Sequence, residues 1–170
     1  MKILALKLIA VMLTVASFAV AGDDFSSPIG VRPIRATFAI DPGPTGYSRE
    51  STIDTAALYD PRYKLKSVSI MDITIATVGP DLGDFSGTVK VNGATLFTYD
   101  GNWSEFNTAQ SVLTSRLVKK NYAGINALTN ALTRGNPVVL SISGVAAKSP
   151  AAKNTNSITL YAPLQGTGVI

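Results

Sequence analysis

The sequence contains no cysteine and no histidine. Without cysteine the chain can form neither a disulfide bond nor a thiolate metal site. Without either residue type it cannot build a Ser-His or Cys-His catalytic relay, and an imidazole metal site is excluded as well. Acid–base chemistry would have to use carboxylates, lysine or tyrosine. These absences favour a protein that is not an enzyme and that carries no cofactor.

Charged residues are scarce, at 15% of the chain, and the 15 basic residues outnumber the 11 acidic ones. Part of the excess lies at the start, where Lys2 and Lys7 come before an apolar stretch at residues 8–21. This stretch is shorter than the roughly 20 residues that a membrane span needs. It ends in Ala-Val-Ala, the small-x-small pattern of a signal peptidase site. The pattern predicts a cleaved signal peptide at residues 1–21.

Cleavage would leave 149 residues, a common size for one domain. Because Lys2 and Lys7 leave with the signal peptide, 13 basic residues remain against 11 acidic ones. This balance is too close to neutral to favour nucleic acid or an anionic membrane as partner. No second segment is long and apolar enough to cross a bilayer. We expect a secreted, periplasmic or cell-surface protein, and export without cysteine favours a bacterial one.

The clearest local signal is a β-hairpin at residues 86–99. Asn92-Gly93 stands between two alternating runs, and these two residues accept the positive φ angles of a type I′ turn. A two-residue turn predicts the register of the pairs that follow it. The expected pairs are Val91 with Ala94, Val89 with Leu96, and Gly87 with Thr98.

The remaining chain also reads as mostly β. Residues 22–32 are predicted to be a flexible leader, and residues 34–40 alternate like a half-buried strand. Asn121 can cap a helix over residues 121–134, whereas residues 108–120 suit a helix or a strand equally. Turn signals at regular spacing predict one antiparallel β-sandwich over residues 33–170, immunoglobulin-like or jelly-roll-like. It would have seven or eight strands and one crossover helix.

The best candidate for recognition is the aromatic and acidic stretch at residues 99–106. Its rings could stack on a sugar, and its polar side chains could bond the sugar hydroxyls. The alternative is that Trp103 and Phe106 close one end of the sandwich. The candidate ligand-binding residues are Tyr99, Asp100, Asn102, Trp103 and Glu105.

Carboxylates near this stretch allow two further hypotheses. The spacing Asp100-x-Asn102-x-Ser104 is that of the start of a calcium loop, although the later positions of the full motif are missing. Asp81 and Asp84 could add oxygen ligands from a neighbouring loop, so the candidate calcium ligands are Asp81, Asp84 and Asp100. The same carboxylates with Glu105 would serve a small hydrolase, the least favoured alternative.

The leader and the strand after it suggest a different class of function. A strand at residues 34–40 that follows a Pro- and Gly-rich leader could swing out and add to a neighbour's sheet edge. We therefore expect an exported structural or adhesive subunit that self-associates by strand exchange. The alternative is a carbohydrate-binding module that uses residues 99–106 on an extracellular glycan.

Overall fold

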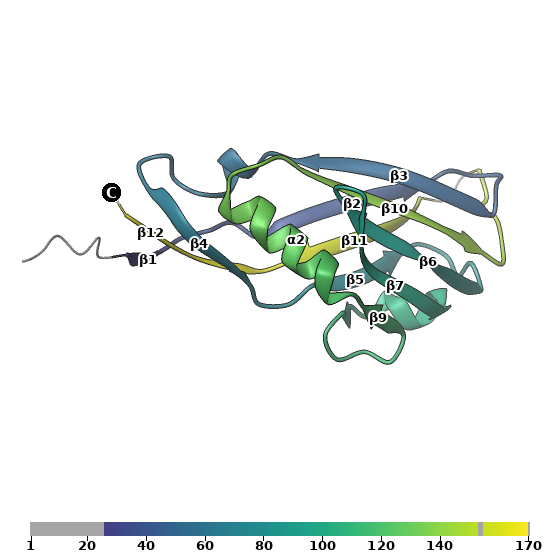
Figure 1. Ribbon diagram of the computed structural model, residues 1–170. Helices are drawn as coiled ribbons and strands as arrows, with labels where there is room; N and C mark the ends of the chain where they lie inside the picture. Colours follow the sequence, from purple (N-terminus) through teal and green to yellow (C-terminus); the bar gives the residue numbers. More distant parts are fainter. Residues whose placement is uncertain (1–25, 153–154, 170) are drawn as a thin grey trace, which may run out of the picture.

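The computed structural model describes residues 26–152 and 155–169. The predicted signal peptide and the first residues of the leader lie outside this range. The described residues form twelve strands in three antiparallel sheets, with one α-helix and two short 3₁₀-helices (Figure 1). The predicted class, a mainly antiparallel β protein of sandwich type with one helix, is confirmed. Among the described residues, no helix is long and apolar enough to span a membrane.

Two larger sheets pack face to face and enclose the core. Where burial alternates along a strand it shows which side chains face inward, as in Ile34, Ala36, Phe38 and Ile40. In spatial order, the five-stranded sheet consists of β3 (Gly46–Ile53), β10 (Val138–Ala146), β6 (Asp84–Val91), β7 (Ala94–Asn102) and β9 (Val118–Lys120). The four-stranded sheet consists of β2 (Ile34–Ile40), β11 (Asn156–Ala162), β5 (Thr74–Val78) and β8 (Gln110–Ser111).

A third sheet continues the four-stranded sheet at one end of the molecule (Figure 1). It consists of β1 (Ser27–Ile29), β12 (Leu164–Val169) and β4 (Lys64–Ile70). Only Pro163 separates β11 from β12, and residues 71–73 separate β4 from β5. Because proline has no N–H to donate to a ladder, it breaks the strand at this point. The three strands of this extension, together with the short strands β8 and β9, are why the structure has more strands than the seven or eight expected.

The predicted flexible leader is partly ordered. Ser27–Ile29 forms β1 and pairs with β12, and Val31 makes an isolated bridge to Tyr59. The ambiguous residues 108–120 form neither a helix nor one long strand. They contain β8 and β9, joined by turns.

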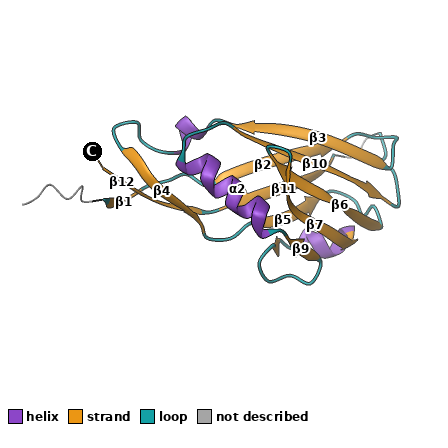
Figure 2. Ribbon diagram, viewed as in Figure 1, coloured by secondary structure: helices purple, strands orange, loops and turns teal. Residues whose placement is uncertain are grey.

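The predicted helix is present as α2 (Tyr122–Thr133). The Asn121 side chain caps it by accepting hydrogen bonds from the N–H groups of Ala123 (3.0 Å) and Gly124 (3.4 Å). The helix connects the edge strand β9 with β10 and packs against β7 and β6 on the way. It lies between the β6–β7 hairpin and β4 (Figure 2). Its apolar side, which includes Leu128 and Leu132, is buried.

The hairpin β6–β7 turns where predicted, with Asn92 at φ 47° and Gly93 at φ 84°. Val91 pairs with Ala94 as expected, but a bulge follows, and Val89 pairs with Phe97 instead of Leu96. The expected pairing of Gly87 with Thr98 is wrong for the same reason, since Gly87 pairs with Tyr99. The extra residue lets Leu96 and Phe97 both point into the core, where both are fully buried.

Candidate functional site

The predicted recognition stretch runs from the end of β7 into the 3₁₀-helix η2 (Trp103–Asn107). The Asn102 side chain accepts a hydrogen bond from the Ser104 N–H at 3.1 Å. In return, Glu105 Oε2 accepts one from the Asn102 N–H at 2.7 Å. This reciprocal pair is a capping box, so the polar side chains of Asn102 and Glu105 stabilise the start of η2. Asp100 is exposed on the outer face of the sheet.

The two aromatic candidates of that stretch face the core. Trp103 is 0% exposed and Tyr99 is 2% exposed. The Trp103 ring meets Phe85 edge-on at 4.9 Å between centroids, and Phe106 meets Phe85 at 5.3 Å. Trp103 Nε1 donates to the carbonyl of Gly79 at 3.4 Å. Neither ring offers a face that a sugar could reach, because both close one end of the apolar core.

Tyr99 forms a buried hydroxyl pair with Tyr47 of β3. The two hydroxyl oxygens are 2.5 Å apart, and Tyr47 also donates to the carbonyl of Ser86 at 3.1 Å. The rings fit because Gly87 and Gly144 have no side chain, and a Cβ at either glycine would clash with a tyrosine hydroxyl. Burial is the main reason why the pKa values of both tyrosines lie well above the usual 10.0.

These raised pKa values predict a loss of stability at alkaline pH. Above about pH 10 both tyrosines ionise in the unfolded chain but stay protonated in the folded one, so their contribution is fully present only below that pH. The free energy of unfolding should fall by about 1.4 kcal/mol per pH unit for each tyrosine. Urea unfolding between about pH 9 and pH 11 measures this slope. The double variant Tyr47→Phe, Tyr99→Phe should lose it, whereas Tyr122→Phe should keep it; an unchanged slope in the double variant would contradict the assignment.

The three candidate calcium ligands do not form a metal site in the described part of the chain. There, no group of three acidic, histidine or cysteine side chains is placed to hold a metal ion. Asp81 Oδ1 accepts a hydrogen bond from the Gly83 N–H at 2.9 Å and so shapes its own turn. Asp84 lies on β6 opposite Asn102, and Asp100 lies on β7 opposite Ser86; both residues are exposed.

An open groove of about 360 Å³ lies where β7, β9 and the start of α2 meet. Ligand sites of small molecules commonly begin at about this volume. β9 pairs with β7 so that Lys119 stands directly opposite Thr98. We call this feature the Tyr122 groove; its lining residues are Thr95, Thr98, Lys119, Lys120, Asn121 and Tyr122.

Among the large apolar residues that the structure describes, Tyr122 is the most exposed, at 64%. Lys120 Nζ lies 5.4 Å from the centre of its ring and donates to the carbonyl of Leu113 at 3.0 Å. These two contacts hold the lysine beside the ring. Lys119 is exposed, and no carboxylate of the described residues forms an ion pair with it. The groove therefore combines an aromatic face, two hydroxyls and a free ammonium group.

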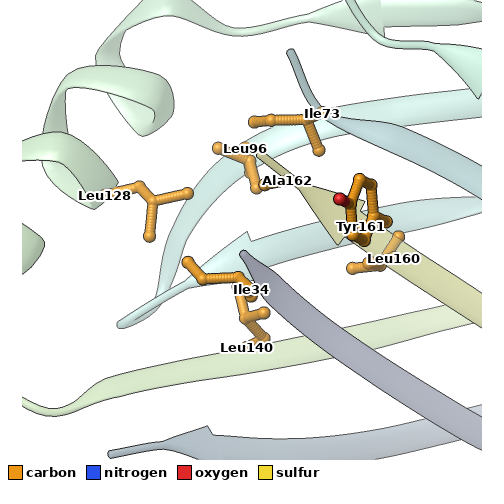
Figure 3. A pocket seen from close by; sticks show the side chains of 8 residues that line it. All are labelled: Ile34, Ile73, Leu96, Leu128, Leu140, Leu160, Tyr161 and Ala162. Atoms are coloured by element: carbon orange, nitrogen blue, oxygen red, sulfur yellow. The ribbon is translucent and has the colours of Figure 1, made fainter. Parts of the chain in front are cut away.

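Two other hollows suit a ligand less well. The first is an apolar cavity of about 10 Å³ between α2 and the two sheets, where Leu128 faces Ile34 and Leu96 (Figure 3). It is barely large enough for one water molecule. The second, of about 460 Å³, lies beside the leader and includes Arg32, Tyr59 and Asp60. Hydrogen bonds from Arg62 lower the pKa of Asp60 to about 2, so the carboxylate there already has a partner.

Reasoning from the sequence missed the Tyr122 groove because its residues come from two separate segments, 95–98 and 119–122. Thr98 and Lys119 become neighbours only through the pairing of β7 with β9. The local sequence signal at Asn121 predicts a helix cap and gives no indication of a binding site. The chain matches no protein-family model, no curated protein and no solved structure.

Proposed function

We propose that the protein is an exported, non-enzymatic adhesive module that binds carbohydrate in the Tyr122 groove. The observation that carries this proposal is the exposed Tyr122 ring beside the hydroxyls of Thr95 and Thr98. The ligand class is the one considered for residues 99–106, but the site is different. Export is supported by the signal-peptide pattern, and the non-enzymatic role by the lack of histidine and cysteine.

Each wall of the groove would have a distinct task. The flat apolar face of Tyr122 would stack on the C–H face of a sugar ring. Thr95 and Thr98 would donate to and accept from sugar hydroxyls. Lys119 would attract a carboxylate or sulfate group, so acidic glycans should bind more tightly than neutral ones. The Asn121 side chain caps α2 and would shape the wall without contacting the ligand.

The replacement Tyr122→Ala tests the site. We expect at least a tenfold loss of affinity for the glycan that the native protein selects from an array, since one lost stacking contact is worth about 1.4 kcal/mol. Tyr161→Ala is the matched control, because Tyr161 is also an exposed tyrosine, at 40%, but lies on β11 of the other sheet. Isothermal titration gives the affinities of both variants.

Both variants should keep the stability of the native protein within about 0.5 kcal/mol, because neither ring is part of the core. An equal loss of affinity in the two variants, or no loss in Tyr122→Ala, would rule out the groove. Failure of the native protein to bind any neutral or acidic glycan would reject the carbohydrate proposal itself.

We further propose that the sandwich is of the immunoglobulin-like or jelly-roll-like type. Support comes from the connections, since the chain changes between the two larger sheets from β2 to β3, from β5 to β6 and from β10 to β11. Repeated sheet changes of this kind are typical of Greek-key sandwiches.

A further inference from the structure

Residues 26–31 pack along the edge of β12, which has space for alternate apolar side chains. β1 pairs with β12 in antiparallel register, with Ser27 opposite Gly168 and Ile29 opposite Gly166. A Cβ at Gly166 would clash with the Val31 side chain, and a Cβ at Gly168 would lie 3.1 Å from Ile29 Cδ1. Ile29 and Val31 therefore fill the space above two glycines. This is how a sheet edge selects a particular strand, with pockets for every second side chain.

The segment at this edge of β12 is held by few contacts. β1 has three residues, of which Ser27 and Pro28 are exposed, and Pro28 has no N–H for the ladder. Beyond it, Val31 makes a single bridge to Tyr59. The Arg32 N–H then donates to the carbonyl of Leu58 at 2.6 Å, and Pro33 follows. By contrast, β2 makes seven register pairs with β11 and buries four side chains. A strand exchange at this end would therefore move residues 26–31 and leave residues 34–40 in place.

We propose that residues 26–31 exchange between two copies of the chain and pair with the partner's β12. If the segment left without replacement, the β12 edge and its two glycines would be uncovered, and an open sheet edge favours pairing with another strand. The occupant that fits is the same segment of a second copy, because its side chains already match the edge of β12.

The positions of the donated strand β1 and of the accepting edge of β12 decide which assembly results. β1 and β12 lie at the same end of the molecule, next to each other (Figure 1). When a copy donates and accepts at one end, the two exchanges are related by a two-fold axis and the assembly closes. The expected product is a reciprocal dimer, not the filament that a strand donated to a distant edge would build. Because the contacts are the same in both forms, protein concentration sets the balance between monomer and dimer.

Disulfide trapping tests the exchange, since the native chain has no cysteine. The exported single variants Pro28→Cys and Thr167→Cys are mixed at high concentration, diluted and oxidised. Residues 28 and 167 are register partners, at a Cα separation that a disulfide can bridge. We expect a covalent heterodimer, with mass spectrometry identifying a bond between positions 28 and 167. Thr37→Cys mixed with Thr159→Cys is the matched control, because these partners join β2 to β11, and it should give no heterodimer.

Two further measurements make the outcome decisive. The double variant Pro28→Cys, Thr167→Cys at low concentration should close its disulfide within one chain, which shows that the pair is competent. If it closes and the mixture gives no heterodimer, the exchange is rejected. A heterodimer in the Thr37/Thr159 mixture would reject it too, because β2 would then be the exchanging strand. If the double variant does not close, the solution mass decides: the native protein should shift from monomer to dimer on concentration, and a mass that stays monomeric overturns the proposal.

Discussion

Replacing Trp103 with alanine is expected to lower the free energy of unfolding by about 3–5 kcal/mol. Its side chain is 0% exposed and packs edge-on against Phe85. The truncation removes buried apolar area and leaves a cavity that the surrounding rings cannot fill by small shifts. Because small domains are stable by about 5–15 kcal/mol, this loss is a large part of the total. Urea unfolding at neutral pH measures it.

The same variant separates the two roles considered for Trp103. As part of the core, it should leave the affinity of the remaining folded protein for glycan unchanged within about twofold. Tyr122→Ala is the matched control with the opposite pattern, since stability should stay and binding should be lost. A Trp103→Ala protein that loses less than about 1 kcal/mol while losing all glycan binding would restore the sugar-binding interpretation.

The second large effect is expected at Gly124, where helix propensity and packing predict opposite changes in stability. In an isolated helix, Gly→Ala stabilises by about 1 kcal/mol. Here a Cβ would lie 2.7 Å from Leu96 Cα and would clash with the carbonyl oxygen of Thr95. Overpacking against backbone costs about 1–3 kcal/mol. We expect Gly124→Ala to destabilise the protein by about 2 kcal/mol.

The helix cannot easily move away to relieve this contact. The Asn121 N–H donates to the carbonyl of Leu96 at 3.0 Å and ties the start of α2 to β7. Asn126→Ala is the control, because Asn126 lies on the exposed side of α2 and the change should stabilise by at most about 0.5 kcal/mol. Thermal unfolding of both variants is sufficient. A stabilised Gly124→Ala variant would show that α2 does not rest on the backbone of β7.

Several elements follow from local sequence signals, and the structure confirms them. The turn at Asn92-Gly93 forms because these two residues tolerate positive φ, at 47° and 84°. The helix α2 begins where Asn121 can accept from free N–H groups. The strand β2 is readable because its apolar residues alternate with polar ones. Such signals need only neighbours in the sequence.

The register of the central hairpin shows where local reasoning ends. A regular continuation from the turn would put Phe97 and Tyr99 on the face opposite to Leu96. In the structure a bulge at Leu96 sends all three side chains inward, where they are buried. The gain comes from contacts with Leu128 of α2, with the Phe85 ring and with the Tyr47 hydroxyl. Leu128 and Tyr47 are distant in sequence from the hairpin. A rule based on turn length cannot include that energy.

Local sequence signals were sufficient to predict the antiparallel β class, the hairpin turn, the helix and its cap, and the lack of imidazole and thiol chemistry. Which aromatic side chains face solvent depends instead on how distant parts of the chain pack together. Trp103 and Tyr122 are both large rings next to polar residues, and their exposed fractions of 0% and 64% follow from the elements that pack over them. Burial is a property of surfaces that meet across the chain, so a sequence pattern can propose a binding residue but cannot place it.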